Sequence, residues 1–76
     1  VCHQANVRII DHIQRALALP EDKVIKTVKL HANCSAASIP LAFASLYGQN
    51  KLKPTDLLAF AAIGAGLTWG ACLIRW

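Results

Sequence analysis

Hydrophobic residues recur with helical spacing near the start of the chain. Ile10, Ile13 and Leu17 follow one another at i, i+3 and i+7, with charged and amide residues between them. This pattern predicts an amphipathic helix over residues 5–19. We expect the helix to end before Pro20, because the residue that precedes a proline is disfavoured in the helical region.

The next segment, residues 24–30, is rich in β-branched residues. Apolar and polar side chains roughly alternate in it, and Val24, Lys26, Val28 and Leu30 share one side. This pattern predicts a strand. A small, polar stretch follows the segment, and we expect Ser35 or Ser38 to cap the helix that comes after it.

That second helix, over residues 36–47, is unusual because it has no polar face. A helix that is apolar all round has to be covered on every side. A chain of 76 residues cannot supply such a cover, so we expect the helix to lie between two sheets, one of them from outside this sequence. Gly48 is a suitable C-cap.

Residues 57–74 contain no charged side chain and admit two interpretations. As one helix, the run is just long enough to span a membrane. As two strands, Leu57–Ala62 and Leu67–Arg75, it would turn at Gly64-Ala65-Gly66. The strands are favoured, since each glycine weakens a helix by about 1 kcal/mol. The membrane helix stays as an alternative, because small residues also occur at contacts between membrane helices.

The element order is therefore helix, strand, helix, strand, strand, which indicates an α/β fold. Val1-Cys2 is interpreted as the end of a further strand. Hydrophobic residues make up 55% of the chain, which is rich for 76 residues, and methionine is absent. We therefore expect the chain to be a piece of a larger protein.

Charge and cysteine content narrow the function classes. The net charge is +4, but the basic residues are scattered and no aromatic residues lie among them, which argues against nucleic-acid binding. An acidic protein partner or a phosphorylated carrier fits the charge, as does an ordinary solvated surface. The three cysteines form no CxxC motif, so neither a disulfide framework nor a zinc site is indicated.

Two polar residues lie where predicted strands meet helices. His3 follows the strand end at Val1-Cys2, and Asn33 follows the strand over residues 24–30. Ligands of open α/β sheets gather at the carboxyl ends of strands, so both side chains would point into one crevice. Their N–H groups would together make an oxyanion hole. Structural roles, as a packed histidine and a turn asparagine, are the simpler alternative.

Three motifs stand out along the chain. They are His3-Gln4-Ala5-Asn6, Asn33-Cys34-Ser35-Ala36-Ala37-Ser38-Ile39-Pro40 and Gly64-Ala65-Gly66-Leu67-Thr68-Trp69-Gly70. They resemble those of the β-ketoacyl-acyl-carrier-protein synthase III family, in the order and at the spacing of that family, and the ending, residues 73–76, is similar too. The resemblance implies a thiolase-like layered α/β/α/β/α fold with two buried central helices, of which residues 1–76 would be the C-terminal portion.

The resemblance also implies a reaction. A starter acyl group from coenzyme A is condensed, with loss of carbon dioxide, with malonyl-acyl-carrier protein. The product, a 3-ketoacyl-carrier protein, initiates fatty acid synthesis. His3 and Asn33 would be the catalytic histidine and asparagine of a Cys-His-Asn site. The nucleophilic cysteine would lie in an N-terminal half outside this sequence, so the isolated fragment is expected to be inactive. The chain departs from the family pattern at Ala32 and at Ala62-Ile63, where glycine and glycine-phenylalanine are usual.

Acyl carrier protein and acyl-CoA are the partners that the resemblance implies, with a homodimer for the full-length enzyme. No cofactor, metal, nucleic acid or stable membrane insertion is expected, and the compartment would be a bacterial cytoplasm or a plastid stroma. A non-catalytic relative with the same fold is a further alternative. The residues expected to bind the carrier protein are Gln4, Ala5, Asn6, Val7 and Arg8.

Overall fold

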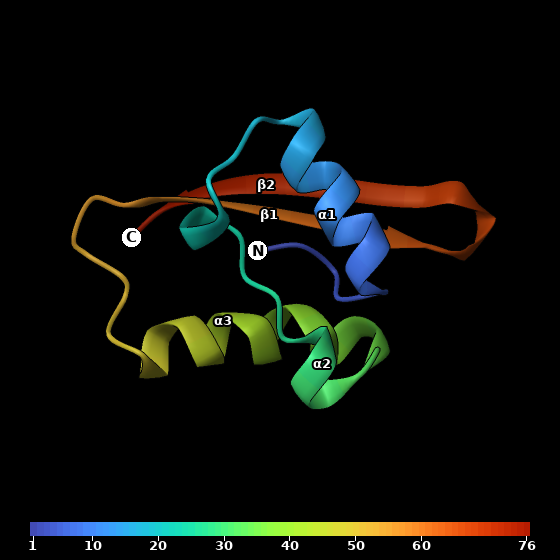
Figure 1. Ribbon diagram of the computed structural model, residues 1–76, viewed down its shortest axis with the longest axis horizontal. Coiled ribbons are helices and arrows are strands. Elements are labelled where there is room, and N and C mark those ends of the chain that lie inside the picture. The colour runs from blue at the N-terminus through green and yellow to red at the C-terminus, as the bar shows by residue number, and fades with distance from the viewer.

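A long antiparallel hairpin and three helices make up the chain (Figure 1). The structure, a computed structural model, describes all residues from 1 to 76. Short 3₁₀ helices lie at Glu21–Lys23, Ser35–Ala37 and Ala65–Leu67. The helices and strands are α1 (Val7–Ala16), α2 (Val28–His31), α3 (Ser38–Gly48), β1 (Leu57–Gly64) and β2 (Thr68–Arg75).

Helix α1 confirms the centre of the helix predicted over residues 5–19. Asn6 caps its start, since the Asn6 Oδ1 accepts a hydrogen bond from the backbone N–H of Ile9 at 3.0 Å. Ile10 is fully buried beneath the helix. The helix ends at Ala16, earlier than predicted, because Ala18 takes a positive φ of 50°, which a helix does not accommodate.

The strand predicted over residues 24–30 is wrong. The chain is not paired with another strand there, and from Val28 it forms the single turn of α2. The reason is the side chain of Gln4. It donates to the carbonyl of Ile25 and accepts from the backbone N–H groups of Thr27 and Val28. One amide group thus supplies hydrogen bonds that a neighbouring strand would otherwise have made.

Helix α3 corresponds to the predicted apolar helix. Ser38, Ala42 and Leu46 form its buried face, whereas Leu41 and Tyr47 are exposed. The expected side-chain cap is wrong, because no side chain caps this helix. The Ser38 hydroxyl contacts residues 3 and 4 instead. The second sheet expected to cover the exposed sides of this helix stays a prediction.

The two predicted strands are confirmed. Strands β1 and β2 pair from Leu57↔Arg75 to Gly64↔Thr68, and Gly66 has the positive φ of 78° that the turn requires. The membrane-helix alternative is wrong, because residues 57–74 form two paired strands and a short turn and not one continuous helix. Across the whole structure, no helix combines the length and apolar character that a membrane crossing needs.

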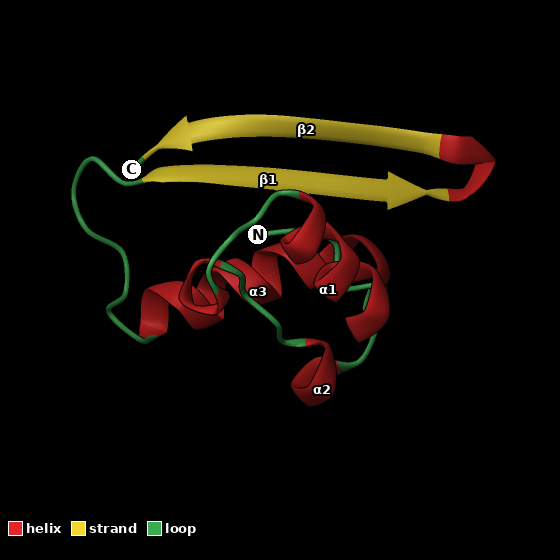
Figure 2. Ribbon diagram, turned by 45° about the horizontal axis from the view of Figure 1, so that its top comes forward, coloured by secondary structure: helices red, strands yellow, loops and turns green.

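The N-terminal segment connects the hairpin to the helices. Cys2 forms a parallel bridge with Ala61 of β1, and the His3 N–H donates to the Ala61 carbonyl at 2.7 Å. The strand end expected at Val1-Cys2 is therefore confirmed. Figure 2 shows the helices on one side of the hairpin, and Phe43 of α3 packs against Phe60 of β1 with ring centroids 5.9 Å apart.

Candidate active site

The backbone and ring of His3 are held by two different elements. Its N–H bonds to Ala61 of β1, and its ring Nδ1 lies 2.6 Å from the Ser38 Oγ at the start of α3. The side chain is half-buried. One ring nitrogen is thus occupied inside the protein, and the opposite edge of the ring is left for a pocket.

Asn33 comes from a turn, because the strand expected before it does not form. It follows α2 and Ala32, which has a positive φ of 56°. The Asn33 Oδ1 accepts a hydrogen bond from the backbone N–H of Ser35 at 3.0 Å. Because only the oxygen of the amide can accept a hydrogen bond, this bond distinguishes the Asn33 oxygen from the Asn33 nitrogen. The amide nitrogen makes no hydrogen bond within the chain, so its two N–H groups are available to a ligand.

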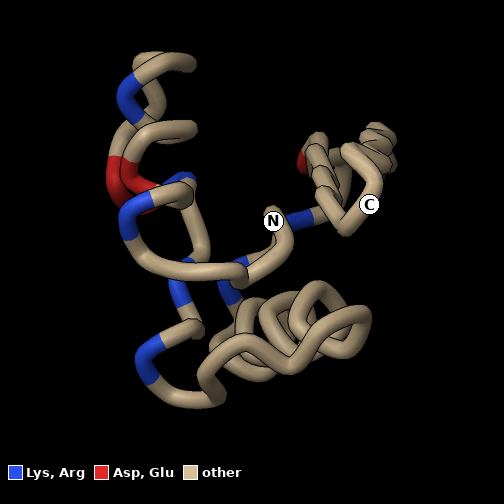
Figure 3. Tube along the Cα trace, turned by 90° about the vertical axis from the view of Figure 1, so that its right-hand side faces the viewer, with Lys and Arg blue, Asp and Glu red and all other residues tan.

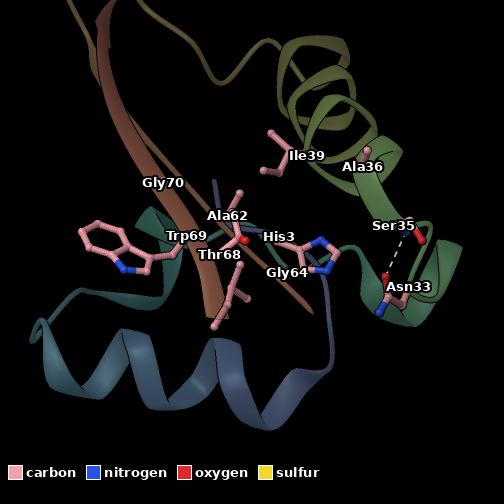
Figure 4. Close-up of a pocket in the computed structure, with 11 residues that line it drawn as sticks. His3, Asn33, Ser35, Ala36, Ile39, Ala62, Gly64, Thr68, Trp69 and Gly70 are labelled. Atoms are coloured by element: carbon pink, nitrogen blue, oxygen red, sulfur yellow. Dashed lines mark hydrogen bonds between the residues drawn. The ribbon is translucent and has the colours of Figure 1, made fainter. Parts of the chain in front are cut away.

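His3 and Asn33 line one open pocket of about 560 Å³. Figure 4 shows the Asn33 oxygen bonded to Ser35 and the amide nitrogen at the opposite end of the group. The rest of the lining consists of Ser35, Ala36 and Ile39 together with residues 62–64 and 68–70. The predicted convergence of the two residues is therefore confirmed, although a turn and not a strand delivers Asn33. Two N–H donors at one opening can bind an oxygen that becomes negatively charged.

The three motifs meet at this pocket. The first supplies His3, the second supplies Asn33, Ser35, Ala36 and Ile39, and the third supplies Gly64, Thr68, Trp69 and Gly70. Segments 30 residues apart in sequence are thus brought to one opening by the bridge at Cys2 and the packing of α3. Ala62, one of the departures from the family pattern, also lines the pocket.

Gln4 is one supporting residue whose role the sequence did not reveal. Its side chain is only 1% exposed, and its amide group makes four hydrogen bonds to its own chain. This side chain is therefore not exposed for direct contact with a carrier protein, and the carrier-protein role expected of Gln4 stays a prediction. Gln4 instead connects the segment of His3 to residues 25–28, which lead through α2 to Asn33.

The other four residues expected at the carrier protein surround the start of α1. Asn6 and Arg8 are exposed, and Ala5 and Val7 are half-buried. Arg8 forms no ion pair within the chain, so its charge is free. Figure 3 shows most of the Lys and Arg positions along α1 and the segment that leads to α2, away from the hairpin.

Lys26 forms two ion pairs on this side of the molecule. The Lys26 Nζ lies 2.8 Å from Asp11 and 4.0 Å from Glu21. The hydrogen bond from Lys26 holds the pKa of the Asp11 carboxyl below its ordinary value. Lys26 is therefore partly neutralised, whereas Arg8 is not.

None of the three cysteines lines the pocket, and all are free thiols. Cys2 is buried, and burial raises the pKa of its thiol, which keeps it protonated and unreactive at neutral pH. The Cys34 Sγ donates to the carbonyl of His31. The chain contains no cluster of three or more His, Cys, Asp or Glu residues that could hold a metal ion.

Comparison with known proteins agrees with the motif pattern. The profile of the family described as "3-Oxoacyl-[acyl-carrier-protein (ACP)] synthase III C terminal" matches residues 1–76. The chain is 64% identical over 74 residues to "Beta-ketoacyl-[acyl-carrier-protein] synthase III" of Rickettsia canadensis, covering 97% of this chain and 23% of that protein. The corresponding protein of Rickettsia akari is 61% identical over the same shares.

Solved structures show the same fold. A crystal structure of 3-oxoacyl-[acyl-carrier-protein] synthase III from Aquifex aeolicus superposes with a TM-score of 0.94 at 45% identity, over 99% of this chain and 24% of that one. The Thermus thermophilus enzyme gives a TM-score of 0.94 at 40% identity, over 99% of this chain and 23% of that one. The α/β arrangement is thus that of the C-terminal part of these thiolase-like proteins. This chain belongs to the 3-oxoacyl-[acyl-carrier-protein] synthase III C-terminal family.

Proposed function

We propose that the complete polypeptide containing this chain condenses a starter acyl-CoA with malonyl-acyl-carrier protein. The product would be a 3-ketoacyl-carrier protein that initiates fatty acid synthesis. One observation carries the proposal: His3 and Asn33, the two residues that match the family's histidine and asparagine, line the same pocket. Because the chain spans about a quarter of the relatives it matches, the remaining parts of the site lie outside it.

The first half of the reaction is an acyl transfer. A cysteine from outside the present sequence attacks the starter thioester, a new carbon–sulfur bond forms, and the thiol of coenzyme A leaves. Neither His3 nor Asn33 is required to hold negative charge on the malonyl group in this step. The present chain contributes the pocket wall made by residues 62–64 and 68–70.

The second half needs the two donors. The bond between the malonyl α-carbon and its carboxylate breaks, carbon dioxide leaves, and the electron pair passes to the thioester oxygen as an enolate. The N–H groups of His3 and Asn33 would stabilise that oxygen. The enolate carbon then attacks the acyl-cysteine carbonyl, and the cysteine thiolate leaves. No metal or other cofactor enters these steps.

The carrier protein would dock at the start of α1. Arg8 is exposed and free of ion pairs within its chain, so it can meet the acidic surface of a carrier protein. Asn6, Ala5 and Val7 would form the edge of this contact, and Gln4 would support it from beneath through its bonds to residues 25–28. We also propose a homodimer and a bacterial cytoplasmic location, the latter supported by the bacterial relatives.

The test of this proposal uses the complete polypeptide with acyl-CoA and malonyl-carrier protein, and measures the 3-ketoacyl product by mass spectrometry. Arg8→Glu should weaken product formation by raising the KM for the carrier protein, and it should spare acyl transfer from coenzyme A. Arg15→Glu, at the other end of α1, is the matched control. Absence of product from the wild type would refute the condensing activity, and equal loss of both half-reactions in Arg8→Glu would refute the docking role.

A further inference from the structure

The hydroxyl group of Ser38 has a place in the fold that helix capping does not explain. Ser38 is only 2% exposed and begins α3. Its Oγ receives the backbone N–H of Gln4 at 3.1 Å and lies 2.6 Å from the Nδ1 of His3. A buried serine thus contacts the ring that the proposed function makes catalytic.

Counting donors and acceptors decides the direction of the short contact. A serine hydroxyl has one hydrogen and two lone pairs, and the Gln4 N–H occupies one lone pair. No other acceptor for the Ser38 hydrogen is present among the side-chain hydrogen bonds of the chain. If the His3 Nδ1 carried a proton and donated it, the Ser38 hydrogen would be buried without a partner, which proteins avoid.

We propose that Ser38 is a positioning residue that donates its hydroxyl hydrogen to the Nδ1 of His3 and so holds the imidazole as the Nε2–H tautomer. This inference rests on the proposed function. The Nε2–H group is then the hydrogen-bond donor that the ring presents to the pocket. Figure 4 shows one ring nitrogen of His3 directed toward α3 and the other toward the side of Asn33.

The backbone on either side of this contact is also held. The Gln4 N–H donates to the Ser38 hydroxyl and the His3 N–H donates to the Ala61 carbonyl. These two bonds anchor the segment that carries the ring between α3 and β1.

Neutron diffraction from crystals of the complete wild-type polypeptide in D₂O tests the tautomer without any substitution. The proposal predicts a deuteron on the His3 Nε2, none on Nδ1, and the Ser38 O–D directed at Nδ1. A deuteron on Nδ1, alone or together with one on Nε2, would overturn it. This result is independent of activity, so it separates failure of the tautomer assignment from failure of the proposed reaction.

Kinetics of variants supply the functional readout. Ser38→Ala should lower the kcat for carbon dioxide release from malonyl-carrier protein by about tenfold to a hundredfold, the range expected when a catalytic group loses its positioning. Ser38→Thr, which keeps the hydroxyl, should restore most of that loss. Ser45→Ala removes a hydroxyl about two turns further along the same helix, where it accepts a hydrogen bond from Gln49, and should leave the rate unchanged. Wild-type kcat in a folded Ser38→Ala variant would contradict the role, and if that variant does not fold, the neutron measurement decides.

Discussion

Replacing Gln4 by alanine should destabilise the fold more than any exposed substitution. The side chain donates to the carbonyl oxygens of Cys2 and Ile25 and accepts from the N–H groups of Thr27 and Val28, with distances from 2.7 to 3.1 Å. Both donors and both acceptor positions of the amide are therefore in use. Alanine removes all four bonds and puts nothing in their place.

The size of the effect follows from burial. The bonds to Cys2 and Thr27 are buried, and the other two are partly buried. Each buried group left unpaired costs about 1–3 kcal/mol, so the two buried ones give roughly 2–6 kcal/mol in the free energy of unfolding. The backbone groups of Ile25 and Val28 are only partly buried. Water can take the place of the lost bonds there, so these two groups add little to the change in the free energy of unfolding.

Urea denaturation of the complete polypeptide measures this change. Gln14→Ala is the matched control, since the Gln14 side chain makes one exposed bond to Leu19 and its loss should cost under about 0.5 kcal/mol. Gln4→Glu keeps the size of the side chain but turns an oxygen toward two carbonyl oxygens. It should therefore be destabilised at neutral pH and should partly recover in mild acid, where the introduced carboxyl can be protonated. A loss below about 1 kcal/mol for Gln4→Ala would refute the structural role of this amide.

Two other predictions concern stability. Asp11→Asn removes the ion pair with Lys26. Because the folded-state pKa of Asp11 is lowered, the pair stabilises the fold above the ordinary pKa of about 4 and this contribution is lost as the pH falls through the lowered value. In thermal melts, the Tm of the wild type should therefore exceed that of the variant at pH 7, and the two Tm values should converge below about pH 4. A difference in Tm that does not change with pH would contradict this linkage. Ile10→Ala should cost about 2–5 kcal/mol in urea denaturation, since Ile10 is fully buried. A cost under about 1 kcal/mol would show that the site collapses around the smaller residue.

Local patterns in the sequence predicted the elements that depend on local chemistry. The spacing around Ile10 gave the centre of α1, and the glycines at 64 and 66 gave the turn between β1 and β2. The strand prediction for residues 24–30 failed because the backbone there forms hydrogen bonds with the side chain of Gln4, which is more than twenty residues away in sequence. No local propensity encodes such a long-range hydrogen bond.

In the candidate site, too, the sequence predicted individual residues but not the long-range contacts between them. His3 and Asn33 could be singled out from their positions and from the family motifs, and the structure places them in one pocket. Ser38 was expected only as a helix cap, because serine before an apolar run is the usual sign of an N-terminus. Its contact with His3 joins residues 35 positions apart, which only the packing of α3 against the N-terminal segment can bring about.

Carbon dioxide release from malonyl-carrier protein tests the central claim most directly. The measurement compares the complete polypeptide in its wild-type form with His3→Ala, and His12→Ala, an exposed position on α1, is the control. The account predicts wild-type decarboxylation, a loss of about a hundredfold or more in His3→Ala, as for removal of one oxyanion donor, and an unchanged rate in His12→Ala. Equal rates in wild type and His3→Ala would contradict it and would leave His3 with a structural role alone.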